Sequence, residues 1–216
     1  MSDAIVVSHA TKLIRGRAVL DDVTLTMERG GIYGFSGING SGKTMLFRAI
    51  SGLIHLTSGQ VDVFDQRIGE DVDFPSDLGL VLESAGFWDE DTGLRNLTML
   101  ASIRGVAGEA EARAALARVG LDPDDDRPFS AYSSGMRQRL TIAQAIMEAP
   151  GLLILDEPTN ALDVDGIEMV AKIVREEHEH GCTVLIACHN EPMLEVLFER
   201  GWRMADGHVV EEVDFS

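Results

Sequence analysis

One stretch of this sequence decides the fold class, and it reads Gly37-Ile38-Asn39-Gly40-Ser41-Gly42-Lys43-Thr44. It has the spacing G-x-x-x-x-G-K-[ST], in which glycines allow successive backbone N–H groups to turn toward phosphate oxygens. An apolar run at residues 32–35 precedes it, and a helical pattern at residues 44–51 follows it. A phosphate-binding loop lies between a strand and a helix in this way. The stretch therefore predicts a nucleotide-binding α/β fold rather than a glycine-rich turn with an incidental lysine.

The residues of this loop have separate predicted tasks. The Lys43 side chain would reach the β- and γ-phosphates, and the Thr44 hydroxyl would bind Mg²⁺. The loop backbone and the positive end of the following helix would hold the other phosphate oxygens. The residues predicted to bind ATP are Gly37, Asn39, Gly40, Ser41, Gly42, Lys43 and Thr44.

A phosphate-binding loop of this kind needs an acidic site beside it, and residues 152–157, Leu-Leu-Ile-Leu-Asp-Glu, supply one. The apolar run predicts a strand buried on both faces, with Asp156 and Glu157 at its carboxyl end, where α/β sheets bind ligands. We predict that Asp156 holds Mg²⁺ through water and that Glu157 is the catalytic general base. His189 directly follows the next apolar strand. It is predicted to bond the γ-phosphate rather than to be an ordinary surface or core histidine.

The charge balance excludes a large class of partners. The 216 residues include 18 Lys and Arg and 36 Asp and Glu, a net charge of −18. Such a surface repels nucleic acid, so no nucleic-acid partner is predicted. Cys182 and Cys188 are too far apart along one strand for a disulfide, which predicts buried free thiols in a reducing compartment. The sequence shows no signal peptide and no apolar run of about 20 residues, which predicts a cytoplasmic protein.

The rest of the chain alternates strand and helix patterns, which predicts a parallel sheet. A helical block at about 88–148 interrupts this alternation and is predicted to be an insertion. The chain is expected to end in a hairpin that turns at Asp206-Gly207. The other expected strands are 4–8, 19–27, 61–64, 78–82 and 183–188, and the expected late helices are 167–180 and 191–200.

Two further motifs complete a pattern. Tyr132-Ser133-Ser134-Gly135-Met136-Arg137-Gln138-Arg139 lies between the phosphate loop and the acidic strand, and Asn160-Ala161-Leu162-Asp163 follows that strand. Together with His189, these motifs resemble the nucleotide-binding subunits of ABC transporters, over essentially the whole chain. The first resembles that family's signature motif in a variant form, the second its D-loop, and His189 its switch histidine.

The resemblance implies a fold and an assembly. The fold is an α/β P-loop NTPase with a RecA-like parallel-sheet core, an N-terminal antiparallel β-subdomain and an inserted helical subdomain. Residues 1–216 would form a single ABC-type ATPase domain, with about 1–87 and 149–216 in a core lobe and about 88–148 in a helical lobe. The assembly is a head-to-tail dimer, in which Ser133, Ser134 and Gly135 contact the γ-phosphate held by the opposite subunit.

The resemblance also implies an activity and partners. The chain would hydrolyse ATP to ADP and phosphate, with Mg²⁺, and couple this reaction to transport, most simply export. Its partners would be separate transmembrane permease subunits and a second copy of itself or a homologous ATPase subunit, on the inner face of the cell membrane. A short coupling helix of the permease would insert near Glu83, Phe87 and Trp88. The alternative for Phe87 and Trp88 is a plain role in the core.

Two departures from the family pattern affect the site. The stretch Lys12-Leu13-Ile14-Arg15-Gly16 lacks the aromatic residue that usually stacks on adenine, so Ile14 or Arg15 would have to replace it. Glu83 stands where the family usually has glutamine, and it is predicted to be catalytic and to bind Mg²⁺. Glutamate at this position, and the stretch Thr92-Gly93-Leu94-Arg95-Asn96-Leu97, resemble exporters of the lantibiotic and bacitracin type.

Two alternatives differ in class from a transporter subunit. A non-transport ABC ATPase, such as a translation factor or a repair ATPase, usually has two such domains or a long coiled-coil or zinc insertion, and this sequence has neither. An adenylate-type kinase would share the phosphate loop. It would leave the signature-like motif and the Asp156-Glu157 pair unexplained.

Overall fold

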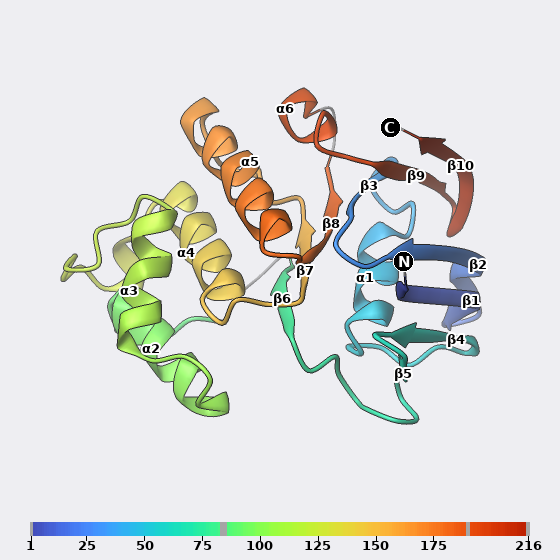
Figure 1. Ribbon diagram of the computed structural model, residues 1–216, viewed down its shortest axis with the longest axis horizontal. Helices are drawn as coiled ribbons and strands as arrows, with labels where there is room; N and C mark the ends of the chain where they lie inside the picture. Colours follow the sequence, from blue (N-terminus) through green and yellow to red (C-terminus); the bar gives the residue numbers. More distant parts are fainter. Residues whose placement is uncertain (1, 83–85, 189–190, 215–216) are drawn as a thin grey trace.

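The chain is shown in Figure 1 as a computed structural model, which describes residues 2–82, 86–188 and 191–214. In these residues a six-stranded sheet has the order β10-β9-β3-β8-β7-β6. All neighbouring pairs in it are parallel except β10 and β9. Its strands are β3 (Ile32–Ser36), β6 (Leu78–Val81), β7 (Leu152–Asp156), β8 (Thr183–Ala187), β9 (Arg200–Ala205) and β10 (His208–Asp214).

A second, antiparallel sheet packs over one face of the first. Its order is β2-β1-β4-β5. Helix α1 (Lys43–Ile50) lies between the two sheets, as Figure 1 shows, and its Leu46 and Phe47 are fully buried there. The strands are β1 (Asp3–Ile14), β2 (Arg17–Glu28), β4 (Ser58–Val63) and β5 (Gln66–Arg67).

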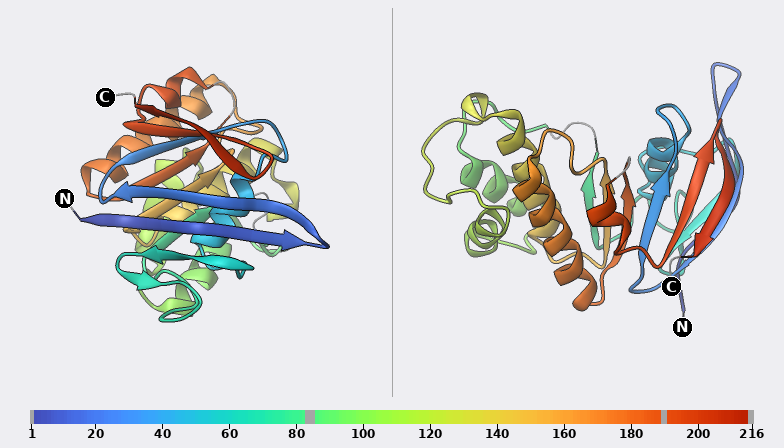
Figure 2. Two further views of the ribbon diagram at one scale, coloured as in Figure 1. Left: turned by 90° about the vertical axis from the view of Figure 1, so that its right-hand side faces the viewer. Right: turned by 90° about the horizontal axis from the view of Figure 1, so that it is seen from above.

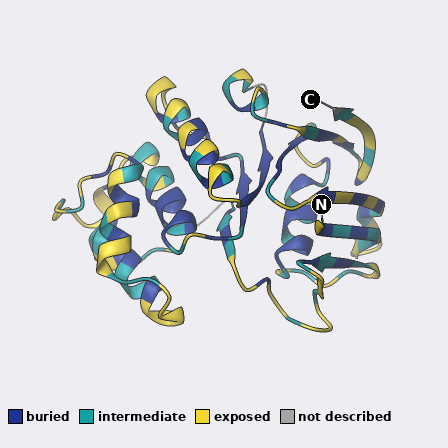
Figure 3. Ribbon diagram, in the orientation of Figure 1, coloured by how far each residue is buried: buried dark blue, intermediate teal, exposed yellow. Residues whose placement is uncertain are grey.

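The helices that follow β6 and β7 cover the other face of the central sheet. A second apolar core fills the space between them and the sheet, and Figure 3 shows the inner strands buried throughout. Helices α2 and α3 lie beyond α4, at the far end of the molecule (Figure 1). The elements are α2 (Gly93–Arg104), α3 (Glu109–Arg118), the 3-10 turn η1 (Phe129–Ala131), α4 (Ser134–Ile146), α5 (Val164–Glu179) and α6 (Pro192–Glu195).

Side chains of the inner strands alternate between the two cores. Leu152 and Ile154 of β7 face the core that contains α1, whereas Leu153 and Leu155 face the core that contains α4 and α5. Because both faces are covered, the strand is apolar at every position before Asp156, as expected for a parallel sheet between two layers.

Most of the predicted elements are confirmed. The predicted α/β class is correct, the N-terminal strands pair antiparallel, and Asp206 and Gly207 form the terminal hairpin turn with φ of 49° and 83°. Cys182 and Cys188 are buried free thiols on either side of β8. The predicted lobe boundaries near residues 88 and 148 stay a prediction.

The helix predicted at 191–200 is wrong over most of its length. Only α6 is helical, and the chain joins the central sheet as β9 from Arg200, which pairs with Tyr33. The Phe198 ring packs against Gly34, where a Cβ would lie 2.2 Å from it. Pairing with β3 therefore outweighs the helical pattern of the segment. The strands predicted at 4–8 and 19–27 are also longer, because β1 and β2 continue through several register shifts.

The helices within residues 2–82, 86–188 and 191–214 are short or polar. Each of them falls below the length or the apolar character that crossing a membrane requires.

Candidate functional site

The phosphate-loop stretch lies between β3 and α1, and its backbone uses conformations that favour glycine. Gly37, Gly40 and Gly42 have φ of 142°, 82° and 110°. A Cβ on Gly37 would lie 2.3 Å from the Met204 carbonyl oxygen, and one on Gly42 would lie 2.9 Å from the Val19 carbonyl oxygen. Glycine is therefore required at both positions for space as well as for φ.

The polar side chains of the loop point inward. Lys43 is 6% exposed, and its ammonium donates a hydrogen bond to the Gly37 carbonyl oxygen at 2.7 Å. The Ser41 Oγ is buried and has no hydrogen-bond partner among the described residues. A buried hydroxyl without a partner is costly. The site therefore has a donor available for an oxygen ligand.

The acidic strand end meets the start of α1. The Thr44 hydroxyl donates to Asp156 Oδ2 at 2.5 Å, although 112 positions separate the two residues in the chain. Asp156 is 4% exposed at the end of β7. The contact brings together two hard oxygen ligands of the kind that Mg²⁺ prefers. The donor set at this point therefore fits that metal ion.

Glu157 follows directly and leaves the sheet in a left-handed conformation. Its φ is 50°, and its backbone N–H donates to the Ala187 carbonyl oxygen at 2.8 Å.

Cys188, at the end of the neighbouring strand, is buried, and burial raises the pKa of its thiol to about 12. Glu195 and Glu157 add to this shift, and Lys43 opposes it. The Cys188 thiol therefore stays neutral at physiological pH beside this site.

These residues surround one open cavity of about 550 Å³. The phosphate loop and the first turn of α1 form part of its lining, and the first N–H groups of a helix have no partner within the helix. The acidic strand end, with Asp156 and Glu157, lines it next to Thr44. The lining residues are Val19, Asn39, Gly40, Ser41, Gly42, Lys43, Thr44, Met45, Leu82, Gln138, Asp156, Glu157 and Asn160.

The first residues of the signature-like motif, at the start of α4, lie outside the cavity lining. Ser133 is the N-cap residue, and its Oγ accepts a hydrogen bond from the Met136 N–H at 3.2 Å. Ser133 and Ser134 are exposed and Gly135 is half-buried, and none of the three lines the cavity. The structure therefore does not bring them to the phosphate loop of their own chain. Glu83 and His189, also predicted to be site residues, lie outside the described residues.

Several cavity residues were not predicted from the sequence. Val19, Met45 and Leu82 come from ordinary strand and helix patterns that carry no functional signal. Gln138 was quoted only as part of the signature-like motif, yet its side chain lines the cavity and its Nε2 donates to the Pro158 carbonyl oxygen at 3.0 Å. Its place five residues after Ser133, on a helix that begins beside the site, is the signal that could have found it.

Aromatic side chains line another part of the molecule instead of the cavity. Phe87, Phe129 and Tyr132 form a chain with ring centroids 5.1 Å and 5.9 Å apart. The Arg137 guanidinium lies 4.9 Å from the Phe129 centroid. This cluster joins the segment before α2 to the start of the signature-like motif. Phe87 is therefore a packing residue, whereas Trp88 is 44% exposed.

Comparison with known protein families identifies the family of this chain. Residues 20–160 match the family described as ABC transporter. The chain belongs to the ABC transporter family.

Relatives agree with this assignment. An uncharacterized ABC transporter ATP-binding protein of Bacillus subtilis, YybJ, is 39% identical, over 94% of this chain and 93% of its own length. The bacitracin transport ATP-binding protein BcrA of Enterococcus faecalis is 38% identical, over 100% and 71%. The lantibiotic transport ATP-binding protein SrtF of Streptococcus pyogenes is 31% identical, over 93% and 86%. The predicted resemblance to bacitracin and lantibiotic ATPases is confirmed.

A solved structure shows the same fold. The dimeric structure of MJ0796, a bacterial ABC transporter cassette, superposes with a TM-score of 0.89 at 24% identity, and covers 98% of this chain and 99% of that one. Family and fold together make the chain an ATP-binding subunit of the ABC type, a family whose general activity is ATP hydrolysis.

Proposed function

We propose that this chain hydrolyses ATP as a subunit of a membrane exporter and works as a head-to-tail dimer on the inner face of the membrane. The observation that carries the proposal is the contact of Thr44 with Asp156 at the mouth of the phosphate loop, with Glu157 beside it. This arrangement combines a phosphate cradle, a pair of metal-binding oxygens and a second carboxylate residue in one cavity.

The chemistry of this proposal uses the residues as follows. Lys43 and the loop amides would hold the phosphate chain, and Thr44 and Asp156 would hold Mg²⁺. When bound, Mg²⁺ supplies charge neutralisation at the phosphate oxygens. Glu157 would accept a proton from the attacking water, since its backbone is fixed by the bond to Ala187. The roles of Glu83 and His189 stay predictions.

The dimer is proposed from the position of the signature-like motif. Ser133 and Ser134 are exposed and outside the cavity, and the cavity is open to solvent. A second subunit could place the same motif over that opening. Two copies related head to tail would then complete two sites, which suits either a homodimer or a pair of homologous subunits.

A surface suited to a permease lies between the end of α1 and the end of α2. It is a shallow cavity of about 530 Å³, mostly apolar, in which Leu53 and Phe74 are 49% and 55% exposed. Arg104 closes one side of it and donates to the Ser76 carbonyl oxygen and to Glu148 at 2.5 Å. Exposed apolar groups in a hollow at a lobe boundary favour docking of a short helix.

Hydrolysis is tested with Glu157→Gln. This change keeps the shape of the side chain but removes the base, so ATP should still bind while turnover falls roughly 10²- to 10⁴-fold. Size-exclusion chromatography with ATP and Mg²⁺ should show the variant as a dimer. Glu168→Gln, on the exposed face of α5, is the matched control and should behave as wild type. Wild-type turnover in Glu157→Gln would overturn the assignment of the base.

The transport partner is tested by co-purification. A polytopic membrane protein should be recovered with the tagged chain from detergent extracts, and Phe74→Glu should reduce that recovery. Val196→Glu alters an equally apolar side chain that is 76% exposed elsewhere, and it should not reduce recovery. Recovery of only soluble proteins would favour a non-transport ABC ATPase.

A further inference from the structure

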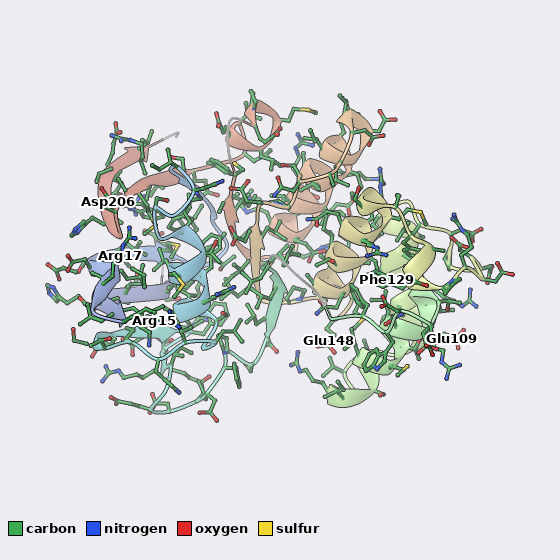
Figure 4. All side chains as sticks on the ribbon, turned by 180° about the vertical axis from the view of Figure 1, so that it is seen from behind. Arg15, Arg17, Glu109, Phe129, Glu148 and Asp206 are labelled. Atoms are coloured by element: carbon green, nitrogen blue, oxygen red, sulfur yellow. The ribbon has the colours of Figure 1, made fainter. Side chains whose placement is uncertain are left out.

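The terminal β9–β10 hairpin contacts the phosphate loop, and none of its described residues lines the cavity. The Gly207 N–H donates to the Ser41 carbonyl oxygen at 2.9 Å. The Gly207 carbonyl oxygen accepts from the Asp21 N–H of β2 at 3.0 Å. Figure 2 shows the hairpin lying beside β2, and Figure 4 shows Asp206 at its tip. The turn is therefore hydrogen-bonded on one side to the loop and on the other to the antiparallel sheet.

Close packing supports these two hydrogen bonds. A Cβ on Gly42 would lie 3.2 Å from Gly207 Cα and 3.4 Å from Met204 Cε, and one on Gly37 would lie 2.3 Å from the Met204 carbonyl oxygen. The two glycines that the sequence motif requires are thus pressed against the hairpin. Part of their requirement comes from this neighbour rather than from a phosphate.

Ion pairs and a ring contact hold the hairpin in place. Arg203 forms an ion pair with Glu211 across the two strands at 2.8 Å, and Arg200 pairs with Glu212. The Trp202 ring stacks on Phe35 of β3 with centroids 5.3 Å apart. The tip therefore has a fixed position relative to the strand that leads into the loop.

The geometry of the peptide group explains how the hydrogen bond from Gly207 to Ser41 affects the site. The Ser41 carbonyl and the Gly42 N–H belong to one planar trans peptide group, so they point in opposite directions. Since the Ser41 carbonyl points at Gly207, the Gly42 N–H points away from the hairpin, and Gly42 itself lines the cavity. An amide fixed in this direction does not have to reorient when an anion binds, and preorganised donors bind more tightly.

We propose that the β9–β10 hairpin is part of the nucleotide site, and that Gly207 is a positioning residue that aims the Gly42 amide at the phosphate chain of a nucleoside triphosphate or diphosphate. This inference rests on the proposed function, because it requires that the phosphate loop binds ATP. It adds a binding element far from the loop in the sequence.

The test compares two alanine substitutions at glycines with the same φ, although a Cβ on Gly207 would also press against the turn's neighbour β2, 3.1 Å from the Val19 carbonyl oxygen. Gly207 and Gly69 have φ of 83° and 84°, and Gly69 lies in another turn, where a Cβ would meet only His55 Nδ1 at 3.6 Å. Both variants should lose thermal stability. Only Gly207→Ala should weaken ATP and ADP binding, by roughly tenfold or about 1.4 kcal/mol. Its KM should rise more than its kcat falls, because ground-state binding is what the hairpin supports.

A second measurement uses the unaltered chain. Amide hydrogen exchange should slow at Gly207 and Asp21 when ADP and Mg²⁺ are added, and it should not change at Gly69. Unchanged exchange at Gly207, or an unchanged Kd for ATP in Gly207→Ala, would overturn the role of the hairpin while leaving the proposed function intact. Failure of the wild-type chain to bind ATP would overturn both.

Discussion

Replacing Asn96 by leucine tests how the segment before α2 is held. Asn96 is fully buried, and its Oδ1 accepts from the Trp88 N–H at 2.7 Å. Its Nδ2 donates to the carbonyl oxygens of Trp88, Asp91 and Thr92 at 3.1, 3.3 and 3.0 Å. Leucine has a similar size and no polar group, so it removes these four bonds without leaving a large cavity.

The expected loss of stability depends on which hydrogen-bond partners of Asn96 keep another hydrogen bond in the variant. The carbonyl oxygens of Thr92, Asp91 and Trp88 still accept from the N–H groups of Asn96, Phe129 and Asp91. Only the Trp88 N–H has no other partner among the described residues. An orphaned donor costs about 1–3 kcal/mol, and each ordinary bond is worth about 0.5–1.5 kcal/mol. The Asn96 amide has two hydrogens, so at most two ordinary bonds are lost besides the orphaned donor, and we expect Asn96→Leu to lower the free energy of unfolding by about 2–6 kcal/mol.

Urea denaturation followed by tryptophan fluorescence measures this difference. Thr98→Val, two residues further along α2, is the control. It removes a single bond from the Thr98 hydroxyl to the Leu94 carbonyl oxygen and should cost less than about 1 kcal/mol. A loss below about 1 kcal/mol for Asn96→Leu would show that the segment does not depend on this side chain, and that the Trp88 N–H finds another acceptor or water in the variant.

Three further outcomes are expected. Because no aromatic side chain lines the described cavity, the contribution of about 1–3 kcal/mol that base stacking makes to nucleotide binding is missing. GTP should therefore compete nearly as well as ATP in a binding assay. A preference for ATP above roughly a hundredfold would refute this. Burial raises the pKa of Cys182 and Cys188 to about 12, so both thiols stay neutral in the fold at a pH where the unfolded chain ionises. The free energy of unfolding should therefore fall between about pH 9 and pH 12, and Cys182→Ala with Cys188→Ala should flatten that fall. The net charge of −18 opposes the compact state, so the thermal midpoint should rise between about 0.05 M and 1 M KCl as screening increases, and a flat or falling midpoint would count against it.

The sequence predicted those parts of the fold that depend on local pattern. The glycine spacing of the phosphate loop and the apolar run before Asp156 each have one structural solution, and both motifs lie where they were expected. The helix predicted at 191–200 failed because its apolar residues suit a helix and a buried turn equally well. Its real structure is decided by pairing with β3, which belongs to a distant part of the chain.

As with the fold, the parts of the candidate site that local motifs mark could be predicted, and the parts that depend on contacts between distant segments could not. The lining residues of the phosphate loop and of the acidic strand end were predicted because sequence motifs mark them. Val19 was missed because its position depends on where the antiparallel sheet packs, and the contact of Gly207 with the phosphate loop was missed because a common Asp-Gly turn gives no sign of what it touches. Contacts between distant segments are set by packing, which single-residue patterns do not encode.

The two-sided burial of β7 has a consequence for how the sheet finds its alignment during folding. Since both neighbouring cores are apolar, a slip of one residue would exchange one apolar side chain for another, and hydrophobic pattern alone would hardly oppose it. The polar ends of the strands do oppose it. A slip of β7 would separate the buried Asp156 carboxylate from the Thr44 hydroxyl that donates to it, and would leave a buried charge with one partner fewer. A slip of β8 against β3 would separate the Thr183 hydroxyl from the Gly30 N–H, whose hydrogen bond it accepts at 3.0 Å. The carboxylate that we propose holds Mg²⁺ therefore also helps to fix the alignment of the strand, so an apolar residue at this position is expected to produce misfolded protein as well as loss of the proposed activity.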